Sequence, residues 1–339
     1  MSPGSHGSRL KARKTYLSSR RDSLTSVRAA VIADGKLVVE EREDPVPGSH
    51  ELLVRVRAAG INGADIHQLG GGYPAPPGWP QDIPGMDLAG EVAALGPKAE
   101  RFAEGDRVMA VVGGGAQAEL AVLHEREAMP VPEGLDWPQA GGLPEVFFTA
   151  HDALFSQAQL RPGERLLVHG GAGGVGTAAI QLGRATGARV TATVRNEDLR
   201  PEVAKLGADA IDPEGFEEQG PFDVVLEVVG APNMPGNLTA LATRGRIAVI
   251  GVGAGFKGEL NLLALMGKRA RIHGSTMRAR PLEEKAIASR LVEKEVLPLF
   301  EDGTLRVPVA ETYPLEQVAA AYERFTAGGK LGKIVLLTS

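Results

Sequence analysis

The chain has 339 residues, of which 43% are hydrophobic and 23% are charged, close to the average for globular proteins. This composition excludes wholesale disorder, and no apolar run approaches the ~18 residues that a membrane-spanning helix needs. The net charge of −5 argues against nucleic-acid binding. The chain has no cysteine, which excludes disulfides, thiolate zinc sites, iron–sulfur clusters and cysteine nucleophiles.

Residues 1–27 form a basic head that differs from the rest of the chain. They hold six Lys/Arg residues and one acid, and they are rich in serine and poor in large apolar side chains. Such a segment buries too little surface to order itself, so we predict a disordered head. It lacks the apolar core of a secretory signal, although organelle import through 1–27 stays an alternative. The expected location is the cytoplasm.

Residues 28–150 contain short β-like runs separated by turns. The clearest turn signals are Asp34-Gly35 and the glycines at 113–115. Strands at this spacing predict an all-β barrel or sandwich. The runs that we expect to form strands are 29–32, 37–39, 52–56, 88–92 and 107–112.

From about residue 164 the pattern changes to strands that alternate with helices. Residues 175–186 predict a helix of small residues, and Gly187 stands where such a helix commonly ends. This alternation predicts a parallel sheet with helices on both faces. A later helix is expected at 282–300, and the tail 306–337 is expected to pair back with the first half. The expected strands of the sheet are 165–168, 189–194, 223–229, 245–250 and 271–273.

The strongest chemical signal is a glycine loop between the first of these strands and the first helix. Gly171-x-Gly173-x-x-Gly176 fits the pattern GxGxxG, and a second strand follows about 20 residues later. One glycine makes the tight turn, one lets a pyrophosphate approach the backbone, and one lets the helix pack close to the strand. The helix N-terminus offers free N–H groups to the phosphates. We therefore predict a dinucleotide site, with a plain glycine turn as the alternative.

The end of the second strand indicates which dinucleotide binds. An NAD site carries Asp or Glu there to hold the adenosine ribose 2′-OH, whereas an NADP site carries a cation. The strand ends without an acid, and Arg195 is able to pair with a 2′-phosphate. Glu197 and Asp198 follow closely and weaken the argument. We expect NADPH as the cofactor; the alternative is that Arg195 is only a solvated loop residue.

Six motifs together carry a resemblance to a known family. One of them reads Gly-Met-Asp-Leu-Ala-Gly-Glu-Val at 85–92, and the glycine loop accompanies them. Over residues 28–337 the chain resembles the zinc-free quinone oxidoreductase branch (the zeta-crystallin-like reductases) of the medium-chain dehydrogenase/reductase superfamily. The motifs lie at 59–65, 84–92, 105–108, 143–150, 274–286 and 332–336.

This resemblance implies an α/β fold of two domains. A GroES-like β-barrel domain would be built from both chain ends, 28–150 and 278–339. A Rossmann domain with a doubly wound parallel sheet, 151–277, would be inserted between them and bind NADP. Cofactor and substrate would share the cleft between the domains. Such proteins are usually homodimers, sometimes tetramers, joined through their Rossmann domains, so we expect a homodimer.

The resemblance also bears on zinc. The three ligand positions of zinc alcohol dehydrogenases match Asn62, Met86 and Glu145, and the four-cysteine structural zinc lobe is absent. These replacements remove the Lewis acid that would polarise an alcohol oxygen. The histidines have no second ligand at a metal-like spacing, so no metal site is expected.

Without zinc, the substrate must accept a hydride readily, as quinones and activated C=C bonds do. We therefore predict an NADPH-dependent, zinc-independent quinone oxidoreductase that acts on a small-molecule quinone or enone. An enoyl or enone reductase of the same fold and a non-catalytic NADPH-binding protein are the alternatives. The resemblance implies that the catalytic residues Asn62 and Tyr73 face the nicotinamide and the acceptor. The alternative for Tyr73 is a rigid aromatic in a Pro-rich loop.

The glycine loop and the resemblance together define the expected cofactor contacts. Thr149 would pack against the nicotinamide, while residues 251–253, 275 and 276 would meet its carboxamide through the backbone. Lys333 resembles a family lysine at the cleft, with a surface lysine as the alternative. The expected cofactor-binding residues are Thr149, Gly171, Ala172, Gly173, Gly174, Val175, Gly176, Arg195, Gly251, Val252, Gly253, Ser275, Thr276 and Lys333.

Overall fold

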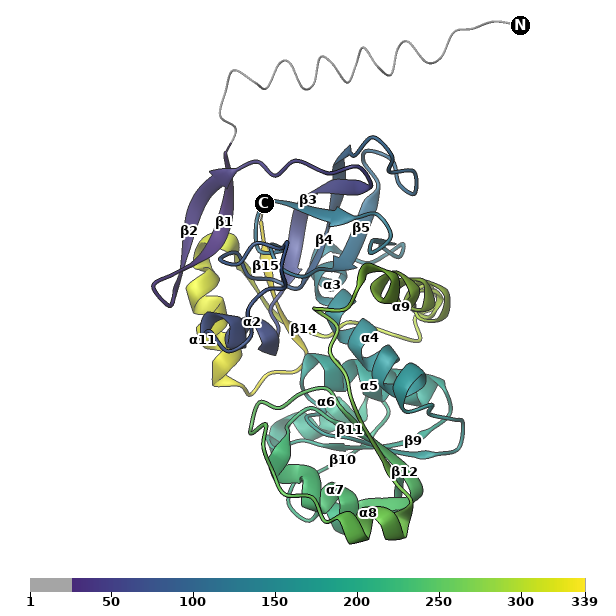
Figure 1. Ribbon diagram of the computed structural model, residues 1–339. Helices are drawn as coiled ribbons and strands as arrows, with labels where there is room; N and C mark the ends of the chain where they lie inside the picture. Colours follow the sequence, from purple (N-terminus) through teal and green to yellow (C-terminus); the bar gives the residue numbers. More distant parts are fainter. Residues whose placement is uncertain (1–25, 339) are drawn as a thin grey trace, which may run out of the picture.

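Figure 1 shows the arrangement of residues 26–338, the part of the chain that the computed structural model describes. Two units are stacked, and the C-terminus lies in the upper one. The predicted basic head, 1–27, lies outside the described residues except for Ser26 and Val27, which begin the first strand. Within residues 26–338, no helix is long and apolar enough to cross a bilayer.

The upper unit is built from both ends of the described chain. A hairpin of β1 (Ser26–Ala33) and β2 (Lys36–Glu43) turns at Asp34 and Gly35, as predicted, and both have positive φ angles, 49° and 72°. A larger sheet has the order β14-β15-β3-β4-β5-β7, with β6 also paired to β3. Its strands are β3 (Glu51–Gly60), β4 (Asp87–Leu95), β5 (Arg107–Val111), β6 (Leu120–His124), β7 (Met129–Pro130), β14 (Val309–Pro314) and β15 (Lys333–Leu337).

The C-terminal strand completes this larger sheet, which confirms the pairing predicted for the tail. Residues 335–337 of β15 lie antiparallel to residues 58–60 of β3, and β14 is parallel to β15. Inward-facing apolar residues such as Leu52, Leu88 and Val108 form a core beneath the sheet. The helices of this unit are α2 (Gly63–Leu69), α3 (Trp137–Gly142), α4 (Pro144–His151), the short η5 (Leu315–Gln317) and α11 (Val318–Ala327).

The lower unit is a six-stranded sheet in the order β10-β9-β8-β11-β12-β13, in which every pair is parallel. The chain starts in the middle, runs outward to β10 and returns on the other side of β8, so the strand order reverses between β8 and β11. Ligands of such sheets bind at the carboxyl ends of the strands beside this reversal. The predicted Rossmann-type sheet is confirmed. Its strands are β8 (Arg165–Val168), β9 (Arg189–Thr193), β10 (Asp209–Ile211), β11 (Phe222–Glu227), β12 (Leu241–Val249) and β13 (Arg271–Gly274).

Small residues allow helix α5 (Gly174–Ala185) to lie close to this sheet. A Cβ on Gly183 would lie 2.7 Å from a methyl carbon of Leu166 on β8. Gly187, with φ 87°, follows the helix end in the left-handed conformation that glycine favours. The other helical segments of the unit are η2 (Glu197–Leu199), α6 (Arg200–Ala204), η3 (Phe216–Gln219), η4 (Ala231–Asn233), α7 (Met234–Ala240) and α8 (Leu262–Lys268).

Two connections join the units at the level of α4 and α9 in Figure 1. Helix α4 continues into a π-helix, η1 (Asp152–Gln157), and residues 275–281 lead from β13 back to α9. The helix predicted at 282–300 is wrong in length, because it forms α9 (Leu282–Glu295) and α10 (Pro298–Glu301). Pro298 has no N–H to continue the first helix and begins the second.

Candidate active site

The glycine loop joins β8 to α5 at the carboxyl end of the parallel sheet. Gly170 has φ 65°, and the N–H of Gly173 donates to its carbonyl at 2.9 Å, which closes a tight turn. A Cβ on Gly176 would lie 2.2 Å from that same carbonyl oxygen, so only glycine lets α5 start this close to β8. Gly173 is exposed, and a Cβ there would have its nearest neighbour at 3.3 Å.

Three backbone N–H groups at the start of α5 are free to bind a ligand. Those of Gly174, Val175 and Gly176 have no acceptor within the described residues. The helix begins at Gly173, which carries no side chain over them. Free N–H groups at a glycine-rich helix start suit a pyrophosphate, because they donate hydrogen bonds to its oxygens along the helix dipole.

The start of β15 lies directly against this loop. The N–H of Gly332 donates to the carbonyl of Ala172 at 2.8 Å, and Gly332 pairs with Gly173 in an isolated β-bridge. The stem of Lys333 passes so close to Gly174 that a Cβ there would lie 2.9 Å from its Cδ. The C-terminal strand thus leads a lysine from the glycine loop into the upper unit.

The ammonium group of Lys333 ends in a buried polar cluster. Its Nζ donates to Asn62 Oδ1 at 2.5 Å and lies 3.3 Å from Asp87 Oδ2. Asn62 Nδ2 donates to Asp87 Oδ1 at 2.9 Å, which closes the triangle. Lys333 is only 3% exposed, so the surface-lysine alternative is wrong. A charge this deeply buried requires a partner, and Asp87, which is fully buried, supplies it.

A second buried carboxylate lies beside this cluster. Asp65 Oδ2 accepts the N–H of Asn62 at 2.9 Å, and its Oδ1 accepts the N–H of Gly85 at 3.2 Å. Burial, and then the charge of Asp87, raises the pKa of Asp65 to about 7, although the Asn62 N–H and the Lys333 charge act in the opposite direction. Asp65 therefore changes its charge near neutral pH.

Helix α4 and the Pro-rich loop that carries Tyr73 face the same cluster. Thr149 Oγ1 donates to Glu145 Oε1 at 3.1 Å. Burial raises the pKa of Glu145, and the Lys333 charge opposes this rise. Burial also raises the pKa of Tyr73, with a further contribution from the Glu145 charge. The charge of Lys333 thus acts on Glu145, and the charge of Glu145 acts on Tyr73.

The remaining expected cofactor contacts lie at the carboxyl ends of β12 and β13. Residues 251–253 follow β12, where a Cβ on Gly251 would lie 2.5 Å from the carbonyl oxygen of Val228. Ser275 and Thr276 follow β13, and the N–H of Ser275 donates to the Val249 carbonyl at 3.1 Å. These strand ends lie on the same edge of the sheet as the glycine loop, because all six strands are parallel.

An ion pair ties this edge to the helices at the junction. Arg280 donates to both oxygens of the Asp152 carboxylate, at 3.0 and 2.7 Å. Ser275 Oγ donates to the same carboxylate at 3.1 Å. Asp152 lies one turn beyond Thr149, so the end of β13 is held next to the helix that carries the expected nicotinamide contact.

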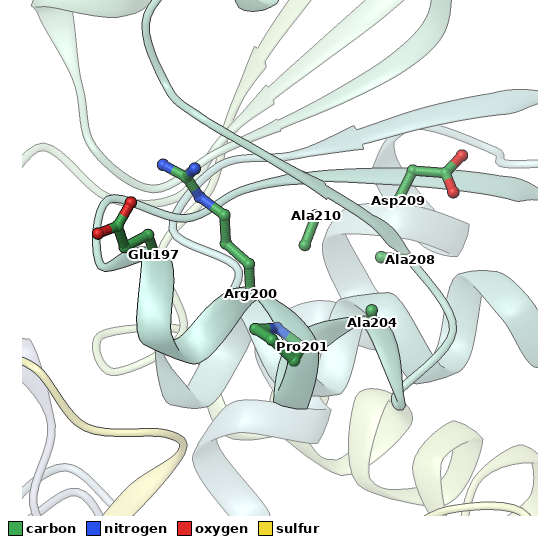
Figure 2. A pocket seen from close by; sticks show the side chains of 7 residues that line it. All are labelled: Glu197, Arg200, Pro201, Ala204, Ala208, Asp209 and Ala210. Atoms are coloured by element: carbon green, nitrogen blue, oxygen red, sulfur yellow. The ribbon is translucent and has the colours of Figure 1, made fainter.

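Arg195 lies two residues after the end of β9, the strand next to β8 in the sheet. It is exposed, and its guanidinium has no hydrogen bond or ion pair within the described residues. Arg200, in contrast, donates to the Val194 carbonyl at 3.1 Å and pairs with Asp212. Figure 2 shows Arg200 beside an open hollow of about 480 Å³ at the edge of the sheet, which none of the expected site residues lines. The hollow is lined by Glu197, Arg200, Pro201, Ala204, Ala208, Asp209 and Ala210.

Known proteins share this arrangement. Residues 48–133 match the alcohol dehydrogenase GroES-like domain, and residues 206–336 match the zinc-binding dehydrogenase family. The quinone oxidoreductase of Mus musculus is 34% identical over 308 residues, which cover 86% of this chain and 91% of that protein. Two solved structures cover nearly all of this chain as well.

The first is a quinone oxidoreductase of Pseudomonas syringae pv. Tomato, with a TM-score of 0.81 and 27% identity over 93% of this chain and 100% of that chain. The second is a mycobacterial protein complexed with NADPH, with a TM-score of 0.82 and 26% identity over 92% of this chain and 100% of that chain. The chain belongs to the medium-chain dehydrogenase/reductase superfamily. Within it, the chain is a member of the quinone oxidoreductase branch and is an NAD(P)-dependent oxidoreductase.

Sequence reasoning missed three residues that the structure adds to this region. Asp65, Asp87 and Arg278 stood inside the recognised motifs without a role. Asp65 follows Asn62 by three residues, which is the spacing of a capping box, and the structure has that box. The capping-box spacing is a local signal, so the sequence alone would have been enough to identify Asp65. The contacts of Asp87 and Arg278 depend on distant parts of the chain and have no local signal.

Proposed function

We propose that this protein is an NADPH-dependent, zinc-independent quinone oxidoreductase, with its acceptor site beside Asn62 and Tyr73. The observation that carries the proposal is the direct contact between the glycine loop and the cluster of Lys333, Asn62 and Asp87. A single lysine thereby joins the proposed phosphate site to a buried polar cluster. When bound, a nicotinamide cofactor supplies the hydride.

The residues at the zinc positions do not fit a zinc ion. Met86 offers a buried thioether, and the Asn62 amide oxygen already accepts a hydrogen bond from the Lys333 ammonium. A metal cation there would meet a positive charge in place of the thiolate and imidazole ligands that zinc prefers. Among residues 26–338 there is no group of three His, Cys, Asp or Glu side chains with metal-binding geometry. These residues support the proposal that the reaction proceeds without a protein-bound Lewis acid.

The protein's own groups would orient the acceptor and exclude water from it. The Tyr73 hydroxyl carries its proton at neutral pH, because a phenol ordinarily ionises near pH 10 and burial raises this pKa further. It would donate to an acceptor oxygen that gains negative charge. The Asn62 side chain holds Lys333 and Asp87 in place, and Thr149 lines the nicotinamide side. Alignment and exclusion of water are sufficient for acceptors that take a hydride readily.

Arg195 supports the choice of NADPH over NADH. Its guanidinium is exposed and unpaired within the described residues, at the strand end where the adenosine ribose would lie. Glu197 and Asp198 are exposed and lie one turn away, in η2. We propose that the expected cofactor residues of the glycine loop, of 251–253 and of 275–276 complete the site.

A homodimer is supported by an apolar patch on the lower unit. Five large hydrophobic side chains between residues 256 and 266 are 38–78% exposed. Three of them lie on helix α8, which directly precedes β13, the edge strand of the parallel sheet. Monomeric proteins rarely leave such a patch beside an open strand edge. The patch residues are Phe256, Leu260, Leu262, Leu263 and Met266.

Oxidation of NADPH should be followed in parallel with 1,4-naphthoquinone, with 9,10-phenanthrenequinone and with a crotonyl thioester. We expect turnover with the quinones that is unchanged by dialysis against a zinc chelator. Turnover with the thioester alone would replace the proposal with the enone reductase alternative. Tight NADPH binding without turnover of any acceptor would favour the non-catalytic alternative.

The cofactor preference should be tested with Arg195→Ala, and Arg189→Ala at the other end of β9 serves as the control. Loss of a charge-assisted hydrogen bond of about 1.5–3 kcal/mol should raise the NADPH KM roughly tenfold or more. The NADH KM should change little, and the control should leave both constants unchanged. Equal effects on NADPH and NADH would contradict the 2′-phosphate role.

A further inference from the structure

We propose that Arg278 is a positioning residue that fixes the Tyr73 loop, residues 73–81, and thereby sets how the enzyme accepts the ring system of its quinone. The inference rests on the proposed function, because it assigns Tyr73 to the acceptor side. Arg278 follows directly on Ser275 and Thr276, the segment expected to meet the nicotinamide. It is 1% exposed and is among the largest fully buried side chains.

Arg278 crosses from the connection between the units into the upper unit and binds three separate segments there. Its Nε donates to the Gly113 carbonyl at 2.7 Å, and its Nη1 donates to the Tyr73 carbonyl at 3.0 Å. Its Nη2 donates to Gln68 Oε1 at 2.5 Å. The guanidinium carbon also lies 5.4 Å from the centre of the Tyr73 ring. One side chain therefore holds the beginning of the Tyr73 loop to α2 and to the turn after β5.

The other end of the loop is held through the same chain of contacts. Gln68 Nε2 donates to the Gln81 carbonyl at 3.0 Å. Gln81 Nε2 in turn donates to the carbonyls of Pro76 and Trp79, at 3.1 and 2.8 Å. Arg278, Gln68 and Gln81 thus link both ends of the loop, which has no secondary structure of its own.

The charge of Arg278 argues against a role in packing alone. All three of its hydrogen bonds go to neutral oxygens, and it has no ion pair within the described residues. Burial lowers its pKa, and the negative charge of Asp65 only partly compensates. A buried cation without an ion pair is costly, and an apolar side chain of similar volume would pack at lower cost. What an apolar side chain lacks is the planar fork that orients three carbonyl or amide groups at once.

A fixed Tyr73 loop has a direct consequence for the acceptor. The charge of Glu145 on helix α4 adds to the rise in the pKa of Tyr73, so we infer that the start of the loop lies on the side of α4 that carries Glu145 and Thr149. The backbone of Tyr73 is bound by a residue that belongs to the segment on the nicotinamide side. Arg278 therefore sets the distance between the Tyr73 loop, on the proposed acceptor side, and residues 275–276, on the expected nicotinamide side. It transfers no proton and no electron.

The test compares Arg278→Met with Arg278→Lys, and Arg271→Met, an exposed arginine on β13, is the matched control. We expect R278M to raise the quinone KM or to lower kcat/KM for quinones about tenfold to a hundredfold, as small misplacements of reacting groups do. The ratio of kcat/KM between 1,4-naphthoquinone and 9,10-phenanthrenequinone should change as well. The NADPH Kd from fluorescence titration should stay within about twofold, and R278K should recover part of the loss. Unchanged quinone constants, or an equal loss of NADPH affinity, would overturn the proposal.

A second variant guards against a folding defect in R278M. Gln68→Met removes the middle of the contact chain, and it should shift the same ratio in the same direction. The double variant should lose less than the sum of the two single effects, because both act through one loop. Additive effects would contradict the chain of contacts.

Hydrogen exchange separates this inference from the proposed function. The Trp79 amide, which donates to the Pro76 carbonyl at 3.2 Å inside this loop, should exchange faster in R278M than in the wild type, with or without any acceptor. If the wild type reduces only the thioester, the quinone proposal fails, while faster exchange still supports the role of Arg278. Unchanged exchange in this loop would overturn that role even if quinones are reduced.

Discussion

Asn62, Asp65 and Asp87 surround Lys333, and hydrogen bonds join Asn62 to both aspartates. Asn62 joins Lys333 to Asp87, and its own backbone N–H is bound by Asp65. Lys333 and Asp87 compensate each other, which leaves Asp65 as the second negative charge of a buried pair of aspartates. Burial is the main reason that ionising Asp65 is costly, and the nearby charge of Asp87 adds to this cost. In the folded protein, Asp65 is therefore harder to ionise than a carboxyl group in water.

This penalty predicts a pH dependence of stability. The pKa of Asp65 is about 7 in the folded protein and near 3.9 in an unfolded chain. Between these values the folded protein holds a proton that the unfolded chain releases. The contribution of Asp65 to the free energy of unfolding therefore falls as pH rises from about 4 to 7, by up to about 1.4 kcal/mol per pH unit.

Asp65→Asn should remove this dependence, because the amide stays neutral; its one acceptor oxygen keeps the hydrogen bond from either the Asn62 or the Gly85 N–H, and the loss of the other is the same at every pH. Urea unfolding of both proteins at pH 5 and pH 8 measures the effect. The variant should be more stable relative to the wild type at pH 8 than at pH 5. A difference between the two proteins that stays constant over this range would contradict the buried, raised carboxyl.

At the scale of the element, the glycine loop combines two roles that different glycines serve. Gly176 is buried, and its missing side chain lets α5 approach the Gly170 carbonyl. Gly173 is exposed at the N-cap with extended backbone angles, φ −75° and ψ 167°, that any residue adopts. Its missing side chain leaves room in front of the free N–H groups, where a pyrophosphate would approach. We therefore propose that Gly176 is required by the fold and Gly173 by the ligand.

Alanine substitutions should separate these roles. Gly176→Ala should lower the free energy of unfolding by about 1–3 kcal/mol, because its Cβ would lie 2.2 Å from backbone oxygen. Gly173→Ala should leave the unfolding midpoint nearly unchanged but weaken NADPH binding about tenfold or more. Thermal unfolding without cofactor and fluorescence titration with NADPH measure the two effects. If both variants lose stability alike, the division of roles is wrong.

The glycine loop also shows how far sequence reasoning reaches. Strand β8, helix α5 and the turn at Gly187 were predicted nearly residue by residue, because hydrophobic period, glycine conformation and phosphate binding are local properties. The break before Pro298 was missed, although proline is a local signal too. The partners of Lys333 could not be predicted, because Asn62 and Asp87 lie 271 and 246 residues away and meet it only once β15 pairs with β3. The contacts of Arg278 could not be predicted either, because its side chain reaches from the connection between the units to residues of the upper unit that are distant in the sequence.

At the scale of the whole molecule, the described chain folds back so that its last strand lies between the phosphate loop and the acceptor side. β15 pairs with β3 in the upper unit, and Gly332 binds the glycine loop of the lower unit. Helix α8 lies at the opposite end of the lower unit in Figure 1 and packs against β12 and α7 of that unit. The apolar patch at residues 256–266 includes this helix, where a second copy would not obstruct the proposed acceptor side.

The proposed homodimer predicts that charges in this patch separate the subunits. Phe256→Glu combined with Leu263→Glu places two carboxylates at positions that are 77% and 78% exposed, so each subunit should still fold. Light scattering after size exclusion should show the wild type at twice the chain mass of 35.5 kDa and the double variant at the chain mass. Ile287→Glu on α9 is the matched control, because Ile287 is 61% exposed but lies outside the patch, and it should leave the dimer intact. A wild type that is monomeric at micromolar concentration, or a control that dissociates as readily as the double variant, would contradict the assignment of this surface.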